Sequence, residues 1–80
     1  MEQIVKVQPK SDYKLELWFK TGEHKLFDCT PYLNKGIFTA LKDQAFFNKA
    51  HVKYGTVCWP NNMDLSPETL FDKSILAGSS

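Results

Sequence analysis

The fold is decided by residues 13–20, which read Tyr13-Lys14-Leu15-Glu16-Leu17-Trp18-Phe19-Lys20. Apolar side chains occupy every odd position, and charged side chains occupy every even position except Trp18. Because successive side chains of a β-strand point to opposite faces, this alternation predicts a strand with one buried face.

The segments on both sides of this strand predict two more strands. Upstream, Ile4, Val5 and Val7 form a β-prone run that ends at Pro9, which has no N–H to donate. Downstream, residues 21–23 read Thr-Gly-Glu and predict a turn, and residues 24–29 return as a third strand. We therefore expect a three-stranded antiparallel meander.

In the middle of the chain, the residues predict short helices. Thr30 followed by Pro predicts a short helix that ends at Gly36, and residues 37–41 are either a second short turn or irregular. Asp43 is a plausible cap for a helix over residues 44–49. The residues expected to point inward from it are Phe46, Phe47 and Ala50.

The last third predicts a hairpin and a terminal helix. Residues 51–54 and 56–59 read as two short strands around Gly55. Ser66 then caps a helix that is expected to run to Leu76, with Leu70, Phe71 and Ile75 inward. The predicted class is α+β, in the order β-β-β-α-α-β-β-α, with a single domain over residues 1–76 and a flexible tail over residues 77–80.

Composition narrows the function classes. The 80 residues suit one small core. Ten basic residues, all of them lysine, balance nine acidic ones, which leaves a formal charge of +1 and no arginine. Since arginine supplies the planar contacts to phosphates and guanine edges, this composition argues against direct nucleic-acid binding.

No stretch approaches the length of about 20 apolar residues that spans a bilayer, and the first residues do not resemble a secretory signal. We therefore expect a cytoplasmic protein without membrane attachment. Cys29 and Cys58 are interpreted as two reduced, buried thiols, although one disulfide between them is not excluded by the sequence.

Residues with catalytic or metal-binding chemistry are few and lack diagnostic spacing. His24, Cys29, His51 and Cys58 are four potential zinc ligands, but no two share a metal-binding spacing, so we predict no metal site. No cofactor motif or small-molecule site is identifiable. Three acids also have structural explanations, because turns and helix starts use such side chains: Asp28, Asp64 and Glu68.

The sharpest enzyme hypothesis is a nucleophilic Cys29, which precedes a predicted helix start that could lower its pKa. No base for it can be named, and packing in the core is the preferred interpretation, so no catalytic residue is predicted.

Trp18 is the most interesting candidate for binding. It occupies the outward phase of its strand, between Glu16 and Lys20, where it is either covered by helices or offered to a partner. We predict an interaction surface formed by Trp18, Lys14 and Glu16.

The segment from Trp59 to Leu70 reads W-P-N-N-M-D-L-S-P-E-T-L. It resembles the W-P-N-x-x-D-L-x-P-x-x-L signature of a small bacterial family, Domain of Unknown Function 2442, and the similarity extends over residues 4–72. Each position also has a folding explanation, because the segment makes sense as a corner between a strand and the terminal helix. The predicted structural corner consists of Trp59, Pro60, Asn61, Asp64, Leu65, Ser66 and Pro67.

The resemblance implies an α+β fold and attaches no enzymatic activity. Relatives occur in toxin–antitoxin-like gene pairs or before a helix-turn-helix domain. The resemblance therefore implies a non-catalytic protein-interaction or regulatory module that binds a protein partner or itself as a homodimer. The alternatives are an accessory or sensory domain of a DNA-binding regulator and a small enzyme with a reactive cysteine.

Overall fold

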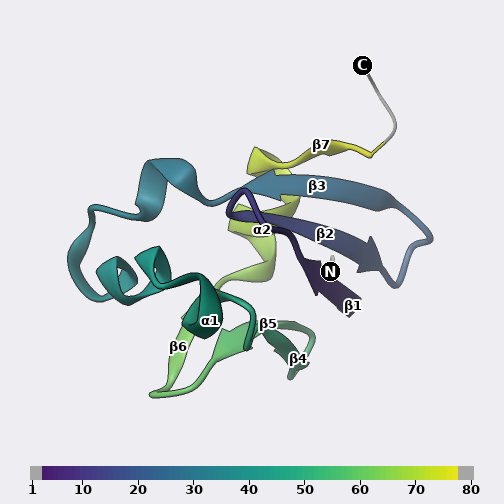
Figure 1. Cartoon of the computed structure of the whole chain (residues 1–80). Helices are drawn as coiled ribbons and strands as arrows, with labels where there is room; N and C mark the ends of the chain where they lie inside the picture. The colour runs from purple at the N-terminus through teal and green to yellow at the C-terminus, as the bar shows by residue number, and fades with distance from the viewer. Residues whose placement is uncertain (1–2, 78–80) are drawn as a thin grey trace.

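The computed structural model describes residues 3–77. The predicted meander is present as β1 (Ile4–Pro9), β2 (Lys14–Phe19) and β3 (His24–Asp28), all antiparallel (Figure 1). A two-residue strand, β7 (Ile75–Leu76), extends this sheet to the order β1-β2-β3-β7. Side chains at the odd positions of β2 are buried, as the alternation predicts.

The helical segment consists of the 3₁₀ helices η1 (Thr30–Tyr32) and η2 (Gly36–Lys42) and the short α1 (Gln44–Phe47). The cap expected at Asp43 is present, since its carboxylate accepts the N–H of Ala45 at 3.1 Å. The cap expected at Thr30 is not, because Thr30 lies inside η1 and donates its own N–H and hydroxyl to the carboxylate of Asp28. Gly36 begins a helix rather than ending one.

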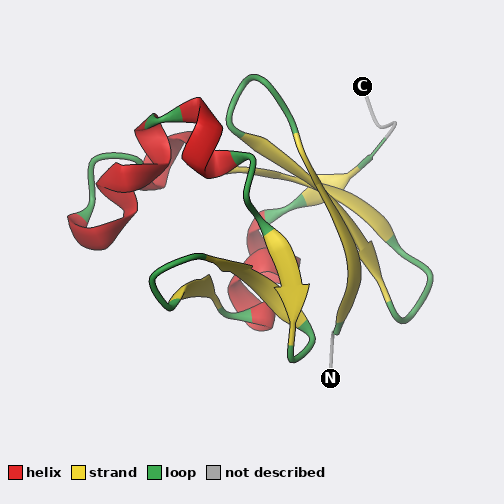
Figure 2. Ribbon diagram, turned by 60° about the horizontal axis from the view of Figure 1, so that its bottom comes forward, coloured by secondary structure: helices red, strands yellow, loops and turns green. Residues whose placement is uncertain are grey.

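A second antiparallel sheet contains β4 (His51–Lys53), β5 (Thr56–Trp59) and β6 (Met63–Leu65) in that order (Figure 2). The sequence pattern predicts no strand at β6 and places Asp64 in a turn that its carboxylate would stabilise. That assignment was wrong, because Asp64 pairs with Cys58 in the ladder. The turn is made by Asn61 and Asn62, whose φ angles are 71° and 60°.

The terminal helix α2 (Pro67–Lys73) starts at the predicted cap, where Ser66 Oγ accepts the N–H of Thr69 at 3.2 Å. The predicted extension of this helix to Leu76 was wrong. Ser74 is extended, with ψ at 162°, and the chain then pairs with β3. Ile75, expected to point inward, is therefore 60% exposed. Pairing with an open sheet edge supplies the hydrogen bonds that a last helical turn would have made.

One buried cluster joins the two sheets and the helices. Leu15 and Leu17 of β2 meet Val57 of β5, Phe47 of α1 and Leu70 of α2, all of them fully buried. The first strand also joins the second sheet directly, because Ile4 donates its N–H to the carbonyl of Gly55 at 2.8 Å.

Lys25 is the one buried lysine among the described residues. Its Nζ donates to the carbonyl of Phe71 at 2.7 Å and lies 3.9 Å from the centre of the Phe71 ring. A cation near the last carbonyls of a helix is favourable, so this contact secures the end of α2 against β3.

Trp59 ends β5, as predicted, and is 2% exposed. Its indole Nε1 donates to the carbonyl of Phe47 at 2.9 Å, and the Phe47 ring lies 6.1 Å from the indole. Leu65, the residue before the Ser66 cap, is also buried. The segment from Trp59 to Ser66 therefore has buried side chains at Trp59 and Leu65 and a short strand where a loop was expected, and its role as a structural corner stays a prediction.

The part of the chain between residues 3 and 77 contains no helix with the length and apolar character that a membrane span requires.

We predict that Trp59→Ala lowers the free energy of unfolding by at least about 3 kcal/mol, since it removes a buried indole and leaves a cavity. Trp59→Phe is the control: it keeps a ring but removes the indole donor, and the Phe47 carbonyl still accepts the N–H of Ala50 at 3.2 Å, so it should cost only about 0.5 to 1.5 kcal/mol. Denaturant unfolding measures both. A Trp59→Ala variant as stable as the parent would contradict the corner interpretation.

Candidate functional site

The side of the first sheet that points away from the core is the first candidate surface. We call it the outer sheet face and define it by Lys6, Lys14, Glu16, Trp18, His24 and Leu26, which occupy the outward positions of β1, β2 and β3. The three residues predicted to form an interaction surface, Trp18, Lys14 and Glu16, all lie on it. The helices make their aromatic contacts with other residues of this region, because Phe71 packs on Phe19 and Phe47 packs on Tyr13, and neither Phe19 nor Tyr13 belongs to the outer sheet face.

Trp18 is half-buried on this face, and neighbours on both adjacent strands hold it. Its ring stacks on His24 with centres 4.5 Å apart and planes 12° apart, and Lys6 Nζ lies 4.7 Å from the ring centre. Lys6 and His24 are its direct partners in the two ladders. The indole is therefore held by side chains of its own sheet.

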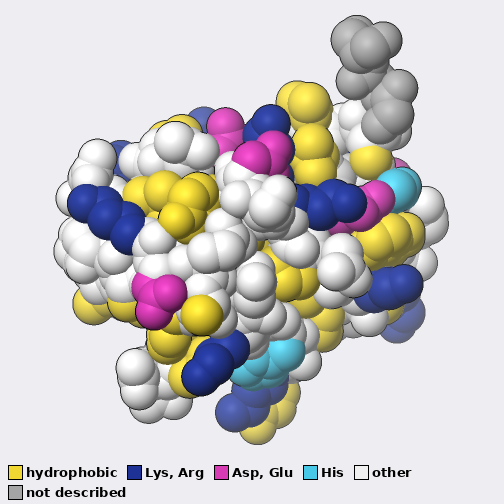
Figure 3. Space-filling view, viewed as in Figure 1, with side chains coloured by type: hydrophobic (Ala, Val, Ile, Leu, Met, Phe, Trp, Pro, Cys, Tyr) yellow, Lys and Arg dark blue, Asp and Glu magenta, His cyan; other side chains and the backbone are white. Residues whose placement is uncertain are grey.

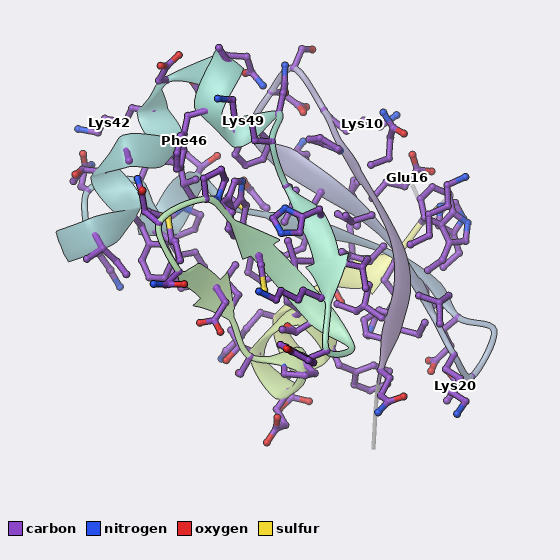
Figure 4. The ribbon with its side chains drawn as sticks, turned by 90° about the horizontal axis from the view of Figure 1, so that it is seen from below. Lys10, Glu16, Lys20, Lys42, Phe46 and Lys49 are labelled. Carbon is purple, nitrogen blue, oxygen red and sulfur yellow. The ribbon has the colours of Figure 1, made fainter. Side chains whose placement is uncertain are left out.

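The carboxylate of Glu16 contacts both His24 and Lys10. One carboxylate oxygen lies 2.6 Å from His24 Nε2 and the other lies 3.2 Å from Lys10 Nζ (Figure 4). The hydrogen bond from Lys10, and then that from His24, hold the pKa of Glu16 below its ordinary value, although desolvation opposes them. Glu16 is thus an anion that fixes the ring on which Trp18 stacks.

Two shallow hollows of about 310 Å³ each meet near Leu26 on the same face. Lys14 and Leu26 border both hollows, Lys10 borders one, and Lys73 and Ile75 border the other. In Figure 3 hydrophobic side chains near the β2–β3 turn are bordered by basic, acidic and histidine side chains. The outer sheet face thus combines exposed apolar area with several ammonium groups.

The second sheet carries the other candidate surface, which we call the rear hollow. It has a volume of about 330 Å³ and lies on the side of β4, β5 and β6 that points away from the core. Trp59, Pro60 and Asn61 contribute to one end of it. The residues that define it further are His51, Lys53, Tyr54, Cys58, Asn62 and Asp64.

Three chemistry-bearing residues form a row across the rear hollow. His51 of β4 pairs with Cys58 of β5, which pairs with Asp64 of β6. The His51 ring is oriented by Nδ1, which lies 3.0 Å from the carbonyl of Lys49. Because Nδ1 donates this hydrogen bond, the lone pair of the neutral ring is on Nε2.

The row does not activate the thiol. Burial, and then the negative charge of Asp64, raise the pKa of Cys58, and the opposing effect of Lys53 is smaller. A nucleophilic cysteine needs a lowered pKa. Cys58 Sγ instead lies 3.9 Å from the carbonyl of Lys53, a contact in which it is the donor.

Cys29, the cysteine of the enzyme hypothesis, is fully buried, and burial raises its pKa to about 12. Both cysteines are free thiols. Within residues 3–77 the four potential zinc ligands are not assembled, and no cluster of three or more histidine, cysteine, aspartate or glutamate side chains could hold a metal ion.

The remaining acids have local roles or lie on the surface. The carboxylate of Asp28 accepts two hydrogen bonds from Thr30, and the hydroxyl bond above all holds the pKa of Asp28 below its ordinary value. Glu68 lies in the first turn of α2, where the helix dipole favours a negative charge.

A comparison with protein-family models matches residues 4–75 to the family described as "Protein of unknown function (DUF2442)". The chain belongs to this family. No curated protein and no solved structure matches the chain. Family membership agrees with the resemblance of the Trp59–Leu70 segment and attaches no activity to it.

Sequence reasoning missed the rear hollow, although part of the signal was present. The two-residue turn Tyr54-Gly55 sets Lys53 opposite Thr56, so it also sets His51 opposite Cys58. Asp64 could not be added to this row because β6 was not predicted.

We predict that Glu16→Gln lowers the free energy of unfolding at pH 7 by about 0.5 to 1 kcal/mol. Since the pKa of Glu16 is lowered from 4.5, its stabilisation is present above pH 4.5 and is lost as the pH falls through the folded-state value. Thermal unfolding of both proteins should therefore converge at low pH. A difference that stays constant from pH 7 to pH 3 would refute the role of the Glu16 charge.

We also predict that native protein exposes one slowly reacting thiol, Cys58, and that Cys29 reacts only after unfolding. Because the pKa of Cys58 is raised above 9.0, its reaction with a disulfide reagent should be slow at pH 7 and accelerate with rising pH. Cys58→Ser is the control and should abolish the native-state reaction. A thiol that reacts faster than a free cysteine at pH 7 would revive the enzyme hypothesis.

Proposed function

We propose that this protein is a non-catalytic protein-interaction module and that the outer sheet face is its contact surface. The observation that carries the proposal is the orientation of Trp18, a large half-buried aromatic side chain held on a sheet face by Lys6 and His24. Tryptophan is the residue type most enriched among the few that dominate binding energies.

The preorganisation of Trp18 supports this role. An aromatic ring that is already fixed by its neighbours loses little conformational entropy when a partner covers it. A tryptophan that served the core would be expected to lie among the inner residues, as Trp59 does with 2% of its surface exposed. Trp18 contributes area to the surface instead.

Charge indicates the kind of partner. The carboxylate of Glu16 is engaged by Lys10 and His24, and that of Asp28 by Thr30. Lys6 contacts only the Trp18 ring among the ionic and cation–π contacts of residues 3–77. The surface therefore suits a partner protein with an apolar centre and carboxylates at its rim.

The test is capture of partners from the native host followed by measurement with each purified partner. We expect Trp18→Ala to weaken the affinity of the true partner about thirty-fold, which corresponds to the loss of a strong contact residue. Ile37→Ala is the matched control, because Ile37 is 65% exposed on η2 and lies outside the outer sheet face. Circular dichroism must show that both variants fold.

Light scattering on the same variants tests the case in which the partner is a second copy of the chain. Self-association that Trp18→Ala abolishes would also support the proposal. A chain that stays monomeric, and whose partners all bind the Trp18→Ala variant as well as the parent, would refute it.

A further inference from the structure

Four residues other than glycine adopt left-handed backbone conformations within residues 3–77. Asn61 and Asn62 have φ angles of 71° and 60°, which asparagine tolerates. Tyr13, with φ at 63°, is held because its ring packs edge-on against Phe47 at 5.4 Å and its hydroxyl donates to the carbonyl of Lys42. Three of the four therefore have an explanation within the fold.

Tyr54 is the exception. Its φ is 54°, in the two-residue turn between β4 and β5, and the residue is 91% exposed. Both central residues of such a turn need positive φ, which favours asparagine, aspartate or glycine at this position. Among the aromatic and cation–π contacts of residues 3–77, the Tyr54 ring takes part in one, with Lys53, whose Nζ lies 5.5 Å from the ring centre. The Tyr54 ring therefore contributes little to the stability of the fold, although its backbone conformation is strained.

Backbone strain that folding does not explain is characteristic of binding sites. Tyr54 also borders the rear hollow, at the end of β5 opposite the turn of Asn61 and Asn62. An exposed aromatic ring and two amide side chains thus border the hollow from the two turns that flank β5.

We propose that the rear hollow binds a short, extended, acidic peptide segment of a partner protein, with Tyr54 as the platform for one of its side chains. This site is separate from the outer sheet face, since it lies on the other sheet. The domain would then have two contact surfaces.

The geometry favours an extended segment. The residues that border the hollow include Tyr54 before β5 and Pro60–Asn62 after it, so an occupant that contacts both groups lies along the strand. Asn61 and Asn62 are exposed and offer amide groups that match peptide N–H and C=O groups.

The charges favour an acidic side chain near β4. Lys53 is exposed there and forms no salt bridge with any residue between 3 and 77. His51 lies on the same strand and has a different role: its Nδ1 donates to the Lys49 carbonyl, so Nε2 of the neutral ring is an acceptor for a peptide N–H; Figure 4 shows Lys49 close to the start of β4. Asp64 on β6 can accept an N–H of the peptide backbone.

The first test is a ¹⁵N chemical-shift titration of the full chain with three probes. They are a pool of capped hexapeptides that contain glutamate and an aromatic residue, the same pool with lysine in place of glutamate, and single-stranded oligothymidine. We expect the acidic pool alone to shift resonances, and these should lie within residues 51–64. No response to the acidic pool, an equal response to the lysine pool, or a response to oligothymidine alone would overturn the proposal.

The second test uses variants of Tyr54. Tyr54→Asn should raise the melting temperature by about 4 °C, because asparagine accepts positive φ, and should weaken the affinity for the acidic pool at least tenfold. Tyr54→Phe keeps the ring and should keep both the affinity and the melting temperature of the parent. Unchanged affinity in Tyr54→Asn would overturn the proposal, because a structural role for the ring predicts no such loss.

A third variant separates this site from the outer sheet face. Trp18→Ala should leave the affinity for the acidic pool within a factor of two of the parent, since its side chain lies on the other sheet. Loss of peptide binding in Trp18→Ala would show a single shared surface and overturn the assignment to the rear hollow.

Discussion

The hydrogen bond from the Trp59 indole to the Phe47 carbonyl links the second sheet to α1, two parts of the fold that are too short to be stable in isolation. The helix α1 has four residues, and an isolated helix of that length is not stable in water. The second sheet has strands of three and four residues. The indole ends the central strand of that sheet and takes the carbonyl at the end of α1, so each short element positions the other.

The division between inner and outer faces follows from this arrangement. The buried apolar side chains of both sheets form one shared cluster, and the opposite face of each sheet lies outside it. On the first sheet the free face carries Trp18, fixed by its ladder neighbours. On the second sheet it carries the rear hollow, where a row of histidine, cysteine and aspartate resembles a catalytic set by composition but has a thiol with a raised pKa. A raised pKa does not favour nucleophilic chemistry at Cys58.

The predictability of the parts differs for physical reasons. The meander could be predicted because the strand period of two is local and visible in residues 13–20, and the same period gathered Lys14, Glu16 and Trp18 on one face. The strands β6 and β7 could not, because three- and two-residue strands carry almost no pattern of their own and exist only where an edge is available. The rear hollow depends on the register of two hairpins, one of which contains β6, so the sequence pattern alone does not predict it. Tyr54 was hidden as well, since its significance lies in a backbone angle.

The position of Lys25 has a consequence for the chemistry of the whole chain. It is enclosed by Phe71 and by the end of α2, whereas most of the other lysines extend into solvent. Amine-directed labelling or acetylation of the folded protein will therefore spare this one ammonium group. Modification at Lys25 becomes possible only when α2 separates from β3, which makes the residue an internal reporter of the detachment of the C-terminal helix.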